Sequence, residues 1–133
     1  MTGIKNLQTL LRSIKPELKP GEYVFAPMGR LPWTEIAALS PLCVFMEDEG
    51  TSLILARSTA DARGVGYDAV FRLISLHVHS SLEAVGLTAA FASALSARGI
   101  SANVVAAYYH DHILVPADKA AQAMQALTEL QKS

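Results

Sequence analysis

All four histidines of the chain fall in its second half as two closely spaced pairs, His77 with His79 and His110 with His112. Imidazoles bind transition metals, and they also change charge near neutral pH. Because side chains alternate along a strand, His77 and His79 would share one face, away from the apolar residues expected in the core. With Asp111 beside the second pair, this set is typical of a metal-binding protein or a metal-dependent hydrolase. The alternative is that the histidines are hydrogen-bonded residues of a surface or an interface.

Positions 80–86 combine two serines, a glutamate and a glycine with apolar residues, and they lead into an apolar pattern with helical spacing. The free N–H groups and the positive dipole end of such a helix favour a carboxylate, and an amino acid carries one. Gly86 would allow a close approach, the hydroxyl of Thr88 could bond to the ligand, and Asn103 could meet an α-amino group. The same residues could instead cap the helix, permit close packing or bond neighbouring backbone. The predicted ligand-binding residues are His79, Ser80, Ser81, Leu82, Glu83, Ala84, Val85, Gly86, Thr88, Asn103 and Val104.

Signatures of common catalytic sites are missing from the sequence. It contains no GxxxxGK[ST] phosphate loop, no GxSxG nucleophile elbow and no HExxH pair. Ser80 could be paired with His79 as nucleophile and base, but adjacent residues of a strand point to opposite sides. We therefore expect a chain without catalytic activity and without a cofactor, and our main reading assigns no metal.

The composition limits the class of protein and its partners. The chain has 133 residues, 51% of them hydrophobic, and a formal net charge of −1 with a pI near 6.4. It should fold around a real core, and it offers no basic surface for nucleic acid or anionic membranes. Cys43 is the only cysteine, so no disulfide can form within the chain, which favours a reducing environment. Without an evident signal peptide or membrane span, the expected location is the cytoplasm.

The second half of the sequence predicts the pattern strand, helix, hairpin, helix. Strands are expected at 71–79 and 101–109, with a helix at 82–98 between them and a last helix opened by Pro116. His110-Asp111 would form the hairpin tip before a returning strand at 112–115. Tyr108 and Tyr109 would then lie on opposite faces, one of them in the core. The helix residues expected to be buried are Leu87, Phe91 and Leu95 in the first helix and Ala120, Met124, Leu127 and Leu130 in the second.

The first half predicts the same order in a shorter form. A helix is expected at 3–15, and a strand at 22–28 leads to a short helix at 33–39. Apolar runs at 42–46 and 53–56 are separated by polar residues, as in a hairpin, and a brief helix at 58–63 follows.

Because both halves read strand, helix, hairpin, helix, we interpret the chain as an internal repeat with a degenerate first copy. Strands paired by hairpins and covered by helices on one face indicate an α+β, ferredoxin-like fold with antiparallel sheets. The predicted domains are an N-terminal helix at 1–17, a degenerate half at 18–69 and a second half at 70–133. A strand order of 4-1-3-2 would bring His79 near His112.

The second half resembles the ACT domain. Leu76-His77-Val78-His79, the run from Glu83 to Phe91 with Gly86, and the Gly99-Ile100 step into the next strand carry the likeness. Over residues 18–131 the chain looks like small stand-alone bacterial proteins with two tandem ACT-like halves, similar to the regulatory region of aspartokinases. The resemblance implies a regulatory or sensory module that binds a small effector, such as an amino acid. Exposed sheet edges favour a homodimer, and an oligomerisation module without a ligand is the remaining alternative.

Overall fold

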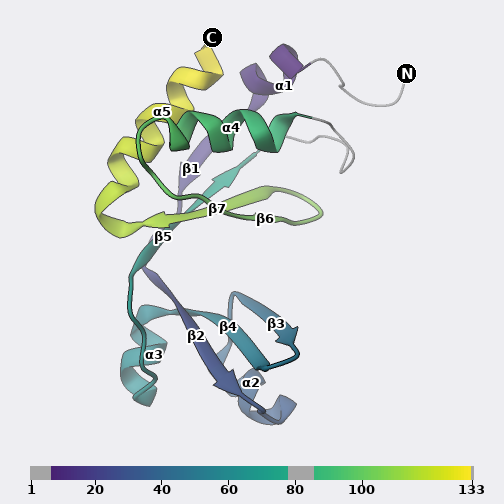
Figure 1. Cartoon of the computed structure of the whole chain (residues 1–133), viewed down its shortest axis with the longest axis vertical. Coiled ribbons are helices and arrows are strands. Elements are labelled where there is room, and N and C mark those ends of the chain that lie inside the picture. The colour runs from purple at the N-terminus through teal and green to yellow at the C-terminus, as the bar shows by residue number, and fades with distance from the viewer. Residues whose placement is uncertain (1–6, 78–85, 133) are drawn as a thin grey trace. The chain divides into compact units, whose positions relative to one another are not determined.

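The computed structural model describes residues 7–77 and 86–132 of the chain. By its internal contacts the chain divides into two compact units (Figure 1). The inserted unit is Gly21–Phe71, and the split unit combines Met1–Pro20 with Arg72–Ser133. The division suggested by the sequence, at 1–17, 18–69 and 70–133, stays a prediction.

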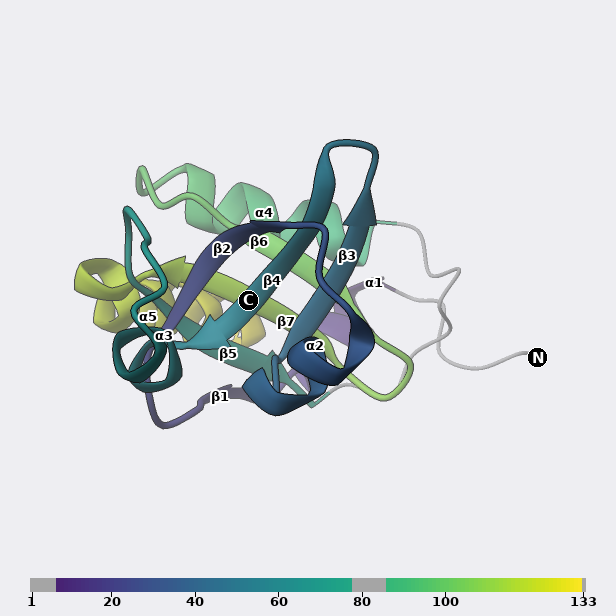
Figure 2. The same cartoon turned by 90° about the horizontal axis from the view of Figure 1, so that it is seen from below.

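The inserted unit is an antiparallel sheet of three strands with two short helices. Figure 2 shows its strands side by side, with the helices on the near side of the sheet. The strand order is β3-β4-β2, and β4 pairs with both of its neighbours. The elements are β2 (Tyr23–Gly29), α2 (Trp33–Leu39), β3 (Cys43–Glu47), β4 (Gly50–Ala56) and α3 (Arg57–Arg63).

The core of the inserted unit lies between this sheet and its helices. Val24 and Ala26 alternate with exposed residues on β2, which is the period-2 pattern of a strand with one buried face. They pack with Leu55, Ile36 and Ala60, which come from β4 and from both helices. Both helices were foreseen nearly to the residue, because Pro32 precedes α2 and Gly64 follows α3.

The β3–β4 hairpin is tighter than the sequence suggested, since Glu47 and Gly50 already pair across it. Gly50 has a φ of 144°, and a Cβ on it would lie 2.8 Å from the Cα of Gly29. The pairing of β2 with β4 shifts register between Pro27 and Gly29 at this point. Glycine is therefore required where the two backbones approach. The sequence predicted a turn of six residues between the two strands, and this is corrected because both strands extend further toward the turn.

The split unit is a four-stranded sheet of order β1-β5-β7-β6. In the expected ferredoxin-like order 4-1-3-2, the first place is taken by β1, a strand that the sequence analysis missed. Figure 1 shows helices α1, α4 and α5 of this unit on one side of its sheet. The elements are α1 (Leu7–Ser13), β1 (Pro16–Leu18), β5 (Phe71–Leu76), α4 (Leu87–Ser96), β6 (Asn103–Ala106), β7 (Asp111–Pro116), η1 (Ala117–Lys119) and α5 (Ala120–Lys132).

The core of the split unit confirms the helical periodicity read from the sequence. Leu87, Phe91 and Leu95 of α4 are buried against β5, β7 and α5. On α5, Ala120 and Leu127 are buried as expected, with Ala123 and Ala126 beside them. Met124 and Leu130 of α5 are only partly buried against this core.

Three strand predictions need correction. β5 ends at Leu76, and β6 is four residues long where nine were expected. The tip of the β6–β7 hairpin is formed by Tyr108 and Tyr109, and Asp111 already belongs to β7. Both tyrosines are exposed, at 72% and 70%, so the expectation that one of them is buried was wrong. The predicted start of α4 at residue 82 lies outside the described residues, which resume at Gly86.

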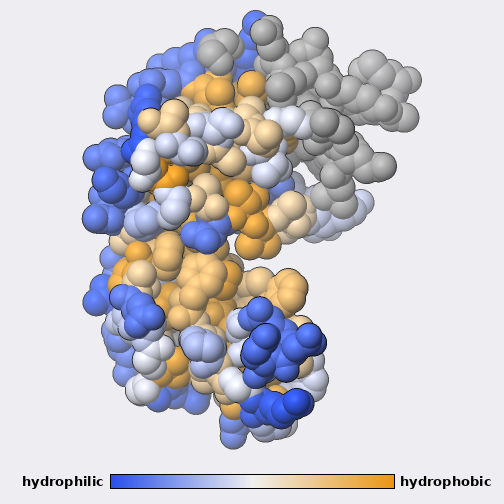
Figure 3. Space-filling view, viewed as in Figure 1, coloured by the Kyte–Doolittle hydropathy of each residue, from blue (hydrophilic) through white to orange (hydrophobic). Residues whose placement is uncertain are grey.

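The molecular surface also carries apolar side chains, as the space-filling view in Figure 3 shows. On the inserted unit, the most exposed large ones are Trp33 of α2 and Phe45 and Met46 of β3. In the described part of the chain, no helix is both long and apolar enough to cross a membrane.

Candidate functional site

A polar face of the split unit's sheet collects several titratable side chains. Ile74 and Ile113 point into the helix-covered core, so their neighbours Ser75 and His112 lie on the opposite face. Glu17 of β1 pairs directly with Ser75 across the sheet. The alternation of three strands therefore places an acid, a hydroxyl and an imidazole on one surface.

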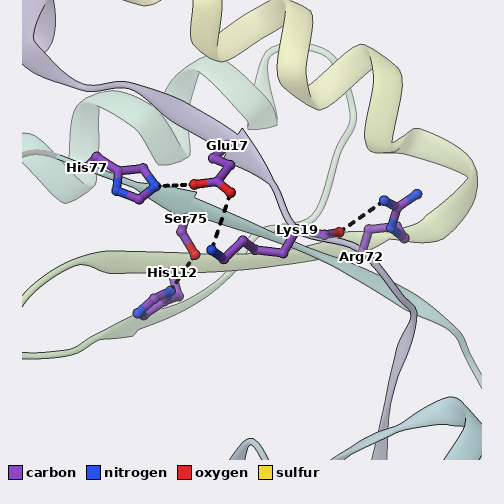
Figure 4. Close-up of polar contacts among 6 residues, drawn as sticks. All are labelled: Glu17, Lys19, Arg72, Ser75, His77 and His112. Atoms are coloured by element: carbon purple, nitrogen blue, oxygen red, sulfur yellow. Dashed lines mark hydrogen bonds and ion pairs between the residues drawn. The ribbon is translucent and has the colours of Figure 1, made fainter.

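His77 and Glu17 form the outer part of this face. The Nε2 atom of His77 lies 2.6 Å from Glu17 Oε1, and Lys19 Nζ lies 3.3 Å from Oε2 of the same carboxylate, as Figure 4 shows. The hydrogen bond from His77 lowers the pKa of Glu17, and the contact with Lys19 lowers it further. Glu17 therefore stays ionised between two donors on an exposed surface.

His112 and Ser75 form the inner part. Ser75 is 1% exposed, and its Oγ lies 2.8 Å from Nδ1 of His112. Burial lowers the pKa of His112, and the nearby His110 adds to this, whereas Asp111 opposes it. Burial also raises the pKa of Asp111. This inner part thus favours uncharged side chains, in contrast to the outer part.

His110 connects the two parts. Its ring centroid lies 4.6 Å from that of His77 and 6.1 Å from that of His112. The Nδ1 atom of His110 is buried without a hydrogen-bond partner among the described residues. We refer to His77, His110 and His112, together with Glu17 and Ser75, as the histidine cluster. Three of the four histidines are thus brought together, as the sequence suggested.

His79 lies outside the described residues, and so does its predicted approach to His112. Within residues 7–77 and 86–132, no three His, Cys, Asp or Glu side chains are arranged to hold one metal ion. The alternative reading from the sequence, a metal set of His77, His79, His110, Asp111 and His112, is not tested, because His79 is not described.

Most of the predicted ligand loop, residues 79–85, also lies outside the described part of the chain. Gly86 is described and immediately precedes α4 with a φ of 93°, a backbone conformation that favours glycine. Its carbonyl accepts the hydrogen bond of Ala90 N–H at 2.9 Å, so the helix is regular from its first turn. Thr88, in that turn, is exposed.

The two predicted site residues on β6 behave differently from each other. Asn103 Nδ2 donates to the carbonyl oxygen of Leu114 at 3.2 Å, which is the backbone bond named above as the alternative role. Val104 is partly buried and packs against the core below α4. No described contact links either residue with Gly86.

Two parts of the described structure were not foreseen. Glu17 and Ser75 join the histidines through the β1–β5 register, and the only sequence signal was the polar residue between Pro16 and Leu18. The inserted unit also contains an open cavity of about 390 Å³ between α2 and α3. Its walls come from two separate stretches of the chain, 28–39 and 63–65, so no local sequence pattern predicts it.

The family of the chain is decided by two matches that together span nearly all of it. One ACT domain family model matches residues 2–72, which is more than half of the chain, and a second ACT domain model matches residues 68–129. This chain belongs to the ACT-domain family. The tandem ACT interpretation of the sequence, with its α+β ferredoxin-like fold, is confirmed.

Solved structures share the fold of this chain. A protein of unknown function from Vibrio cholerae, described as a possible transport protein, is 50% identical over 98% of this chain and 99% of its own, with a TM-score of 0.87. An Agrobacterium tumefaciens protein is 19% identical over 89% of each chain, with a TM-score of 0.72. The ligand-free regulatory subunit of aspartate kinase from Thermus thermophilus is 10% identical over 89% and 97% of the two chains, with a TM-score of 0.67, and shares the fold. No curated protein sequence matches the chain.

Membership in the ACT-domain family indicates a regulatory module that binds small molecules. This coarse function is the one expected from the sequence.

Proposed function

We propose that this ACT-domain protein is a non-catalytic regulatory module that binds an amino acid at the turn leading from β5 into α4. The observation that carries the proposal is Gly86 in its left-handed conformation at the start of a ten-residue helix. The proposal is supported by the two ACT-domain matches, which together cover residues 2–129. The histidines of the polar face, on this proposal, influence stability or assembly and do not perform a reaction.

The start of α4 has the electrostatics that a carboxylate requires. The first N–H groups of a helix have no partner within the helix, and the helix dipole adds a partial positive charge there. No acidic side chain occurs in the first turn of α4, so none of its own carboxylates neutralises this end. A ligand carboxylate would gain hydrogen bonds and a favourable dipole at the same place.

Thr88 and Asn103 would supply the remaining polar contacts. Thr88 is exposed in the first turn of α4, and its hydroxyl can donate or accept a hydrogen bond. Asn103 uses its Nδ2 to bind the Leu114 carbonyl, which leaves Oδ1 as an acceptor suited to an ammonium group. Together these groups suit an α-amino acid better than a simple carboxylic acid.

The proposal is tested by measuring binding of the twenty amino acids to the folded, ligand-free chain by thermal shift and calorimetry. We expect at least one to stabilise the protein at millimolar concentration, because a ligand that binds only the folded state raises its stability. Thr88→Val should weaken that binding several-fold through loss of a hydroxyl contact. Thr128→Val, on α5 of the same unit, is the matched control and should bind normally.

If no amino acid stabilises a protein verified as folded and ligand-free, the proposed ligand class is wrong. If binding occurs but responds equally to Thr88→Val and Thr128→Val, the ligand class holds and the site is misplaced.

We further propose that the module works in the cytoplasm as a homodimer, since β6 ends the split unit's sheet with β7 as its one described neighbour. Light scattering on the same samples reports the mass of the assembly.

A further inference from the structure

The inserted unit has a cavity of its own, far in sequence from the turn before α4. Its volume is about 390 Å³, which falls within the range of small-molecule sites. The lining residues lie at the end of β2, in the following turn, on α2, at the end of α3 and just after it.

The wall of this cavity is mainly apolar. Met28, Leu31 and Val65 are partly buried and pack against the core of the inserted unit, and Leu39 belongs to that core. Hydrocarbon placed here would leave water and contact side chains that are already held in place by the fold. The wall therefore favours a ligand with an apolar part.

Two opposite charges line the same cavity without neutralising each other. Glu35 of α2 makes no ion pair among the described residues, and none joins it to Arg63. The Nη2 atom of Arg63 donates to the carbonyl oxygen of Ala38 at 3.4 Å, which is a long bond. A guanidinium has five N–H donors, so most of its hydrogen-bonding capacity remains for a ligand.

We propose that this cavity is a second small-molecule site, which takes an apolar zwitterion: a molecule with one carboxylate, one ammonium group and a short hydrocarbon side chain. The carboxylate would bind Arg63, the ammonium group would bind Glu35, and the hydrocarbon would cover Met28 and Leu31. Charge complementarity selects this class. A simple fatty acid would offer no positive group to Glu35, and a simple amine would offer no negative group to Arg63. The site lies entirely within Gly21–Phe71 and does not depend on binding at α4.

Three probes dissect the proposed contacts on the isotope-labelled full-length protein, with binding followed by nuclear magnetic resonance. L-leucine carries all three features, N-acetyl-L-leucine lacks the ammonium charge, and 3-methylbutylamine lacks the carboxylate. We expect L-leucine to shift the amide signals of Leu31, Ala38 and Val65 in a saturable way. Each of the other probes should bind about tenfold more weakly, which corresponds to the loss of one charge-assisted contact.

Two variants assign the charges. Arg63→Gln should weaken L-leucine about tenfold while leaving 3-methylbutylamine unchanged, and Glu35→Gln should weaken L-leucine while leaving N-acetyl-L-leucine unchanged. Arg30→Gln is the matched control, because Arg30 is exposed in the same unit and does not line the cavity. Circular dichroism verifies that each variant is folded.

The site is excluded if folded wild-type protein shows no saturable shift at these residues, or if Arg63→Gln and Arg30→Gln bind L-leucine equally. Shifts produced equally by all three probes would mean apolar binding only, and would overturn the zwitterion assignment. A second copy of the chain occupying the cavity would shift the same signals without any probe as protein concentration rises, and would also overturn the assignment. Shifts confined to Thr88 and Asn103 would support the site at α4 and reject this one.

Discussion

At the scale of single residues, the polar face of the split unit sets two histidines in different electrostatic surroundings. His77 lies against the carboxylate of Glu17, whereas His112 is partly buried beside Ser75 and near His110. Burial lowers the pKa of His112, whereas the hydrogen bond from His77 lowers the pKa of Glu17. These two groups should therefore affect stability in different pH ranges.

His112 should make the protein less stable in mild acid. Its pKa is lowered in the folded state, first by burial, so the unfolded chain binds the proton more readily. Above its ordinary pKa of 6.5 the residue is neutral in both states, and as pH falls below that value the free energy of unfolding decreases. Denaturant unfolding at pH 7.5, 6.5 and 5.5 should show this decline, and His112→Gln should reduce it.

The contrasting variant is Glu17→Gln. The lowered pKa of Glu17 stabilises the fold above the ordinary pKa of 4.5, and that contribution is lost as pH falls through the folded-state value. Its effect belongs to a more acidic range, so Glu17→Gln should leave the decline between pH 7.5 and 5.5 in place. A wild-type stability that is flat over this range would contradict the role given to His112.

At the scale of elements, the sequence revealed most where an element was long or had clear ends. Trp33–Leu39 was foreseen because Pro32 stands just before it, where proline favours the start of a helix. β1 was missed because three residues are too few to show a period. The tip at Tyr108 and Tyr109 was placed wrongly because aromatic residues favour strands, whereas here their rings contact each other at an exposed turn.

The candidate site was foreseen only in part, because the sequence indicated the order of the strands but not their register. The sequence indicated that the histidine pairs would meet, since strand order in a ferredoxin-like sheet is a property of the whole repeat. It could not indicate Glu17 and Ser75, because their meeting depends on the register between segments almost sixty residues apart. The cavity between α2 and α3 depends likewise on tertiary packing.

β1 should be a structural part of the split unit. Leu18 packs against the core of that unit, and Lys19 N–H donates to the Leu73 carbonyl oxygen at 2.8 Å. Leu18→Ala should lower the free energy of unfolding by about 2 kcal/mol, the cost of removing part-buried methyl groups. Native-state hydrogen exchange should show faster exchange in β5 and α5 and unchanged exchange in β4.

The matched control for Leu18→Ala is Glu17→Ala, the neighbouring residue on the exposed face of the same strand. It should change the protection of β5 and α5 much less, because it removes no core contact. If the two variants had equal effects, β1 would matter only through its backbone, and the packing role of Leu18 would be wrong.

At the scale of the whole molecule, the order of segments links the folding of the two units. The split unit must join Leu18 to Ile74 across the inserted unit. Within the inserted unit, Tyr23 pairs with Phe71, so folding of that unit holds its two chain ends together. A disordered insert of about fifty residues would instead cost about 3 kcal/mol in loop-closure entropy.

This connectivity predicts an asymmetry between core substitutions. Leu55→Ala in the inserted unit and Phe91→Ala in the split unit each remove a fully buried side chain and should cost about 3 kcal/mol or more locally. Leu55→Ala should also reduce hydrogen-exchange protection of the β1–β5 pair, because opening the inserted unit releases its ends. Phe91→Ala should leave the β2–β4 ladder protected. If either substitution reduced protection equally in both units, the chain would unfold as one cooperative unit. That result would contradict the proposal that the inserted unit folds on its own and holds the two ends of the chain together for the split unit.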